Sequence, residues 1–266
     1  MAERLPVHLE RDFGPAPVQR LLSPLVPRYR DAVAFANLPL ARRRAYEHTL
    51  LTDDGAFLFV KNSKAGCSSI AQILYRYSKG AFAEGKIHNQ RSDFRQGRHY
   101  WRDYEQARTG GKALLFTFVR HPEKRAVSAY SNIFAEKANH VTKHHLAPLV
   151  SRGFDDAKPF GTNFSIFLDY VEESLALDPE FTDKHFRPQT SVIAMDAFDY
   201  GFIGRMENYV ADLKQAFAMA GQDGYLTEDV LGQRFNPSGS AREQLDAGLR
   251  RRLETIYARD YEAFGY

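Results

Sequence analysis

The sequence predicts an α/β fold of the three-layer, P-loop-like type, in which a central parallel sheet is flanked by helices. The first observation is that three short segments, 56–60, 113–120 and 198–204, are apolar almost throughout, as in strands that are buried on both faces. The second is that each segment is followed by apolar residues at helical spacing. Strand alternating with helix is typical of a parallel sheet.

Length and composition favour one domain. The 266 residues are 44% hydrophobic, enough for a full core, and we expect a single domain over 1–266 with an N-terminal extension at 1–50 and a core at 55–266. The net charge of +3 is no nucleic-acid signature. The lone Cys67 excludes an intrachain disulfide, and neither an apolar leader nor an apolar run of about 18 residues occurs. We therefore expect a cytoplasmic protein without membrane or nucleic-acid partners; its oligomeric state stays open.

The N-terminal extension divides into two parts. Residues 1–25 carry scattered prolines and are expected to wrap the surface or to be loosely held. A helical arm is expected from about Tyr29 to Leu51.

The first strand, Ala56–Val60, runs into the turn "VKNSKAGCSSI", after which Ile70 and Ile73 begin a helix. Amides at a helix N-terminus favour a phosphate, and a lysine with two serines adds an ammonium and hydroxyls. The turn lacks the GxxxxGK[ST] spacing, and Lys-Gly-Ser turns without a ligand are also common. We call this predicted phosphate-binding turn the first grip. The residues expected in it are Lys61, Lys64, Ala65, Gly66, Cys67, Ser68 and Ser69.

The second strand, Ala113–Arg120, ends on a guanidinium, and Pro122 sits in the first turn of the helix that follows. Ser128 lies on that helix. Ligands of parallel sheets bind at the carboxyl ends of the strands, so Arg120 and Ser128 are expected to bind a second phosphate. We call these two residues the second grip. The alternative is that Arg120 pairs with a carboxylate of the protein.

Two grips on separate strands imply a ligand with two separated phosphate-like groups. A nucleoside triphosphate would not need the second grip, and no convincing Walker B aspartate ends an apolar strand to hold Mg²⁺. These points weigh against the first alternative, a P-loop kinase that uses Mg-ATP.

The third strand is Phe198–Gly204, followed by Val210, Leu213 and Phe217 at helical spacing. A last helix is expected to open with the capping box at 240–243 and to run inward from Leu245.

With these residues in place, a resemblance can be stated. "VKNSKAGCSSI" and "FVRHPEKRAVSAY" are similar to the two cofactor motifs of the sulfotransferases that use 3′-phosphoadenosine 5′-phosphosulfate (PAPS). The nearest likeness is to the carbohydrate sulfotransferases of the Golgi and their bacterial relatives. The stretches 183–209 and "IYARDYEAFGY" agree, so the resemblance covers residues 55–266.

The resemblance implies roles for the two grips. Lys64 would be the catalytic lysine that stabilises charge on the leaving group, and Ser68 and Ser69 would hold the 5′-phosphate. Arg120 and Ser128 would hold the 3′-phosphate. No metal is expected. Lys61 departs from many relatives and is either a second cofactor contact or simply exposed.

The acceptor implied is a hydroxyl of a saccharide or glycoconjugate, which needs a base. His88 in "GKIHNQ" and His99 in "GRHYW" are the candidates, with His88 preferred. His185 and Arg187 match a family segment near the acceptor and are expected to bind an anionic or sugar group. Alternatively, Arg187 pairs with Asp183 or Glu207 within the protein.

Three further features carry less weight. The histidines at 140, 144 and 145 resemble a metal-ligand spacing but are interpreted as a solvated loop, within a variable acceptor segment at Phe134–Asn163. Trp101 and Tyr104 could stack on a sugar, yet plain packing is preferred. A second alternative, a non-catalytic glycan- or nucleotide-binding protein of the same fold, would tolerate loss of Lys64.

Overall fold

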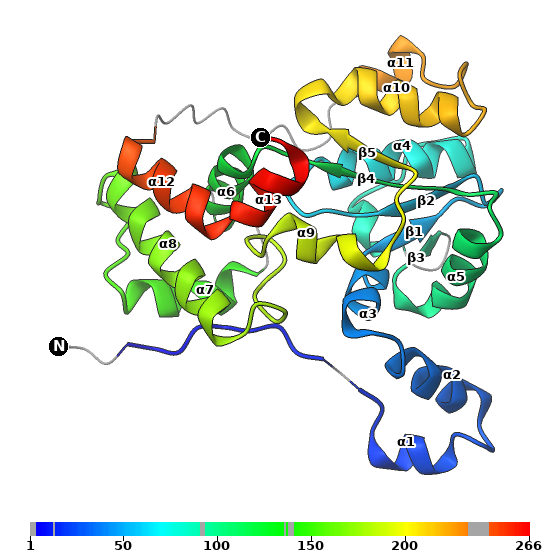
Figure 1. Ribbon diagram of the computed structural model, residues 1–266, viewed down its shortest axis with the longest axis horizontal. Coiled ribbons are helices and arrows are strands. Elements are labelled where there is room, and N and C mark those ends of the chain that lie inside the picture. Colours follow the sequence, from blue (N-terminus) through cyan, green and yellow to red (C-terminus); the bar gives the residue numbers. More distant parts are fainter. Residues whose placement is uncertain (1–3, 13, 91–93, 136, 138–140, 234–244) are drawn as a thin grey trace.

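The computed structural model describes residues 4–12, 14–90, 94–135, 137, 141–233 and 245–266. Within them, one sheet has the strand order β3-β1-β2-β4-β5 (Figure 1). The strands are β1 (Thr49–Leu51), β2 (Phe57–Val60), β3 (Arg95–Gln96), β4 (Leu114–Val119) and β5 (Phe202–Arg205).

The three strands predicted from apolar runs are confirmed as the parallel part of the sheet, although β5 lies at its edge and begins at Phe202 instead of residue 198. β2 pairs with β4, and β4 pairs with β5, both in parallel. Phe59 lies opposite Phe116, and Thr117 lies opposite Ile203. Every residue of β2 is buried, as expected of a strand covered on both faces. The carboxyl ends of β2 and β4 therefore lie side by side.

The helical arm predicted from about Tyr29 to Leu51 is helical only as far as Tyr46 and is divided into two helices. The chain forms α2 (Pro27–Ala36), α3 (Leu40–Tyr46) and then β1. Pro39 precedes α3, and a proline disfavours helical geometry in the residue before it, which separates the two helices. β1 runs antiparallel to β2, and three residues are too few to show a strand period.

Helices cover both faces of the sheet, which confirms the three layers. One face carries α4 (Cys67–Lys79), α10 (Tyr209–Met219) and α11 (Glu228–Leu231) over Phe57, Phe59, Phe116 and Phe118. The other face carries α3, α5 (Trp101–Thr109), α9 (Gln189–Val192) and α13 (Ala258–Phe264). Trp101 and Tyr104 are buried in this second layer, so the packing interpretation is confirmed.

A separate helical core lies beside the sheet, on the left in Figure 1. It consists of α6 (Pro122–Tyr130), η3 (Ser131–Ala135), α7 (Thr142–Val150), α8 (Phe160–Leu177) and α12 (Ala247–Ile256). The segment 134–163, interpreted as a variable acceptor loop, therefore contains α7 and the start of α8. His145, interpreted as solvated, is fully buried against Phe186. The solvated interpretation is therefore wrong for His145, whereas His144 is exposed and His140 lies outside the described residues. The acceptor role of the segment stays a prediction.

The helix predicted to open at 240–243 corresponds to α12 and begins later than predicted. α12 starts at Ala247, and the Asp246 carboxylate caps it by accepting a hydrogen bond from the Leu249 amide at 2.8 Å. The predicted capping box at 240–243 lies outside the described residues. Ahead of the sheet, α1 (Pro17–Leu22) pairs with α2 (Figure 1).

Among the described helices, none combines the length and apolar character needed to cross a bilayer.

Candidate functional site

The turn after β2 has the geometry of an anion grip. Lys64 and Gly66 both adopt left-handed backbone conformations, with φ of 67° and 71°. Gly66 directly precedes α4, which begins at Cys67 without a side-chain cap. Ser68 and Ser69 lie half-buried in the first turn. Free amide donors and partial positive charge at such an end suit a phosphate oxygen.

Gly66 is favoured by its left-handed backbone, and a side chain here would also displace the end of the Met206 side chain. A Cβ at this position would lie 2.4 Å from Sδ of Met206, at the start of the short helix η5 (Met206–Asn208) after β5. The grip after β2 is therefore packed against the residue that follows β5, two strands away in the sheet.

Arg120 of the second grip contacts the backbone of the first grip. Its Nη1 donates to the Lys64 carbonyl at 3.4 Å. Burial lowers the pKa of Arg120, and within the described part of the chain no carboxylate lies within 4.0 Å of its guanidinium. The alternative of a protein carboxylate partner is therefore not observed. Ser128 is half-buried on α6, which follows Arg120.

A buried amide network, which sequence reasoning missed, fixes the ends of β2 and β4. Asn62 donates through Nδ2 to the Phe118 carbonyl and to Gln189 Oε1, both at 3.0 Å. Gln189 in turn donates to the Arg120 carbonyl at 2.8 Å and accepts from the Arg120 amide at 2.9 Å. Both amides are fully buried. The two grips consequently have a fixed separation.

Arg125 is a second residue that the sequence reasoning missed. Its guanidinium donates to the carbonyls of Ser63 at 2.9 Å, Arg187 at 2.9 Å and Lys184 at 2.8 Å. It is 1% exposed, on the inner side of α6 with Ala126 and Ala129. A charged residue on an apolar helix face was the available signal. Arg125 ties the first grip to the 184–187 segment.

His88 lies beside the first grip. It sits on the short helix η1 (Ile87–Asn89), and its Nε2 is 2.9 Å from Oγ of Ser68. The residue as a whole is exposed, while its ring lies against the first grip. Partial desolvation lowers the pKa of His88, and the charges of Lys61 and Lys184 lower it further. The imidazole is therefore neutral near pH 7, as a base must be.

Two other predicted site residues, Lys61 and His99, differ from each other in burial. Lys61 is buried, and its Nζ donates to Gln96 Oε1 at 3.0 Å, so the simply exposed alternative is wrong. His99 is exposed on η2 (Arg98–Tyr100). Within the described residues, it makes no contact with the first grip like that of His88.

The acceptor segment predicted from His185 and Arg187 is held by buried charges. Asp183 Oδ1 accepts from Nδ1 of His185 at 2.7 Å, and Oδ2 lies 3.2 Å from Nε2 of His145. Burial opposes ionisation, but the His185 charge and the two imidazole hydrogen bonds hold the pKa of Asp183 well below its ordinary value. Because an ionised carboxylate can only accept a hydrogen bond, Nδ1 of His185 carries the proton that it donates to Asp183. Nε2 is the ring nitrogen that does not face Asp183.

Arg187 does not form either ion pair considered from the sequence. It is 1% exposed, donates to the Glu180 carbonyl, and lies 4.0 Å from the Glu10 carboxylate. Glu207 instead accepts from the His121 amide at 3.2 Å and from the Tyr266 hydroxyl at 3.0 Å.

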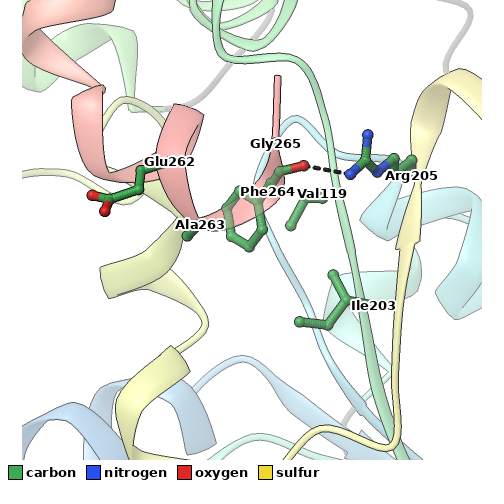
Figure 2. A pocket seen from close by; sticks show the side chains of 7 residues that line it. All are labelled: Val119, Ile203, Arg205, Glu262, Ala263, Phe264 and Gly265. Carbon is green, nitrogen blue, oxygen red and sulfur yellow. Dashed lines mark hydrogen bonds between the residues drawn. The ribbon is translucent and has the colours of Figure 1, made fainter.

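A cavity of about 430 Å³ lies against α13, and Figure 2 shows the side chains that line it. Val119, which precedes Arg120, lines it together with Arg205, whose guanidinium donates to the Phe264 carbonyl. None of the predicted cofactor residues lines this cavity. Among the described residues, no three His, Cys, Asp or Glu side chains are grouped as a metal site.

Comparison with known proteins assigns the family. A profile described as "Sulfotransferase family" matches residues 47–266. Carbohydrate sulfotransferase 14 of Danio rerio is 28% identical over 188 residues, 65% of this chain and 48% of the relative. The Mus musculus protein of the same name is 27% identical over 187 residues, 67% and 48% of the two chains.

Carbohydrate sulfotransferase 11 of Rattus norvegicus is 26% identical over 170 residues, 58% of this chain and 47% of the relative. The chain thus spans about half the length of the curated relatives it matches. No solved structure matches it. Since the profile match extends over both grips and all three parallel strands, the chain belongs to the sulfotransferase family.

Proposed function

We propose that the protein transfers the sulfuryl group of PAPS to a hydroxyl of a saccharide. The observation that carries the proposal is the pair of anion grips at the adjacent carboxyl ends of β2 and β4, joined by the contact of Arg120 with the Lys64 carbonyl. PAPS has a phosphosulfate and a separate 3′-phosphate, which matches two grips. The saccharide acceptor follows from the names of the relatives.

The residues present suit such a ligand. The guanidinium of Arg120 is largely buried, donates to the Lys64 carbonyl and has the Glu207 carboxylate only beyond 4.0 Å, so a bound anion would replace lost hydration. Gly66 supplies the left-handed backbone conformation that leads from the first grip into α4. Lys61 and Lys64, together with Ala65, Cys67, Ser68 and Ser69, would surround the 5′-phosphosulfate, and Arg120 and Ser128 the 3′-phosphate.

The chemistry divides between a cation and a base. PAPS supplies an activated sulfuryl group with a bisphosphate leaving group. Lys64 would stabilise negative charge on the leaving oxygen. Neutral His88 would take the proton of the attacking hydroxyl at Nε2. The Ser68 hydroxyl, now 2.9 Å from this nitrogen, would bond a phosphate oxygen instead and so release Nε2. His185 and Arg187 would orient the acceptor.

The test is transfer of labelled sulfate from PAPS to a panel of neutral and uronic-acid-containing oligosaccharides. We expect a labelled oligosaccharide with the wild type and a loss of at least about 100-fold with Lys64→Ala, the scale of one electrostatic donor. Equal transfer by Lys64→Ala would contradict the proposed role of the lysine. No transfer to any oligosaccharide, with PAPS bound, would contradict the saccharide acceptor.

A further inference from the structure

Residues 5–12, the N-terminal strap, lie outside the part of the chain matched by the family profile, yet they contact the helical core and the acceptor segment. The His8 amide donates to the Tyr170 hydroxyl at 2.9 Å. The Glu10 amide donates to the Phe181 carbonyl at 2.7 Å. These bonds hold the backbone of the strap, and thereby aim the Glu10 side chain at residues 184–187.

The Glu10 carboxylate serves two buried cations at once. It forms an ion pair with Arg44 and lies 4.0 Å from Nη1 of Arg187. The other carboxylate oxygen accepts from the Lys184 amide at 3.4 Å. Arg44 and Arg187 are only 6% and 1% exposed. Burial and, to a smaller extent, the Arg44 charge lower the pKa of Arg187 to about 10, and the carboxylates of Glu10, Glu180 and Asp183 oppose both effects. Without the carboxylate, two buried like charges would face each other.

The segment that Glu10 holds is joined to both halves of the proposed site. It carries His185 and Arg187, and its carbonyls at 184 and 187 accept from Arg125, which also donates to the carbonyl of Ser63, next to Lys64 of the first grip. The segment carries His185 and Arg187 itself and is joined to the first grip through Arg125. Its displacement would therefore disturb acceptor binding before it disturbs the first grip.

We propose that Glu10 is a positioning residue: by neutralising the Arg44–Arg187 pair it fixes His185 and Arg187 in the geometry that the acceptor requires. The acceptor role of this segment rests on the proposed function; the positioning itself does not.

The experiment compares Glu10→Gln with Asp12→Asn. The control removes a carboxylate from the same strap, since Asp12 pairs with Arg43 at 2.5 Å and not with the acceptor segment. NMR of the His185 ring reports its tautomer, and hydrogen exchange reports the amides at 184–187. We expect Glu10→Gln to lose the uniform Nδ1–H tautomer and to exchange about tenfold faster or more at these amides. Asp12→Asn should match the wild type, and Glu10→Asp, which keeps the charge, should restore most of the tautomer signal.

Function is measured in parallel. Glu10→Gln should bind adenosine 3′,5′-bisphosphate within about twofold of the wild type, while sulfate transfer to the oligosaccharide panel falls about tenfold. Wild-type tautomer and exchange in Glu10→Gln, or equal changes in Asp12→Asn, would overturn the inference. If the wild type transfers no sulfate, the proposed function fails while NMR and exchange still decide the positioning. Should Glu10→Gln not fold, the double variant with Arg44→Met removes the repulsion as well. A native His185 signal is then expected in the double variant, and a disturbed His185 signal in it would overturn the inference.

Discussion

Replacement of Arg125 by methionine tests how the first grip is held. Methionine keeps most of the stem volume but removes three hydrogen bonds to carbonyls. The Arg187 carbonyl becomes a buried acceptor without a donor, which costs about 1–3 kcal/mol. The other two bonds are only part-buried, so water can replace them, and each costs about 1 kcal/mol. The gain from no longer burying a cation offsets part of the sum. We expect a loss of about 3–4 kcal/mol in the free energy of unfolding.

The measurement is urea unfolding, with Arg252→Met as the matched control. Arg252 also makes several polar contacts, to Asp169 and Glu172 at 2.7 Å, but these lie at the surface. Its loss should cost about 1 kcal/mol or less. Equal destabilisation by the two substitutions would refute the reasoning that Arg125 is a buried cross-link. The folded fraction of Arg125→Met should also bind adenosine 3′,5′-bisphosphate more weakly than Arg252→Met, since Ser63 directly precedes Lys64 of the first grip.

Three other predictions concern the grip and the base. Gly66→Ala should lose about 1–2 kcal/mol of unfolding free energy from its left-handed backbone alone, measured by urea unfolding, and should weaken bisphosphate binding as Met206 is displaced; unchanged affinity would argue against this turn. His88→Ala should lower sulfate transfer at least about 100-fold and His99→Ala less than about threefold; the reverse order would make His99 the base. Because the pKa of His88 is lowered from 6.5, the ring stays neutral to a pH below that value. In the pH profile of kcat/KM, the loss of activity on acidification should therefore have its midpoint below pH 6.5 and be absent from His88→Ala. A midpoint above pH 7 would contradict the assignment.

The sequence predicted those parts of the fold whose pattern is local. β2 and β4 are apolar at nearly every position, and Pro122 marked the start of α6. β1 could not be recognised by periodicity because it has three residues, although the Asp-Asp-Gly turn after it is a hairpin signal.

The residues that fix the site could be predicted less well. Lys64 and Arg120 stand directly at strand ends, where ligand residues are expected. Gln189 and Glu10, in contrast, act on partners far away in the chain: Gln189 bonds Asn62, 127 positions away, and Glu10 bonds the Lys184 amide, 174 positions away. A single buried polar residue has no period of its own, so only the folded chain reveals its partner.

The most direct test of the two-grip site is calorimetric titration of the wild type with adenosine 3′,5′-bisphosphate and, separately, with ATP and Mg²⁺. Micromolar binding of the bisphosphate, weak binding of ATP, and a loss of about 2–4 kcal/mol in binding free energy in Arg120→Ala are the expected results. Absence of bisphosphate binding, or tighter binding of Mg-ATP, would contradict the use of PAPS and favour a kinase.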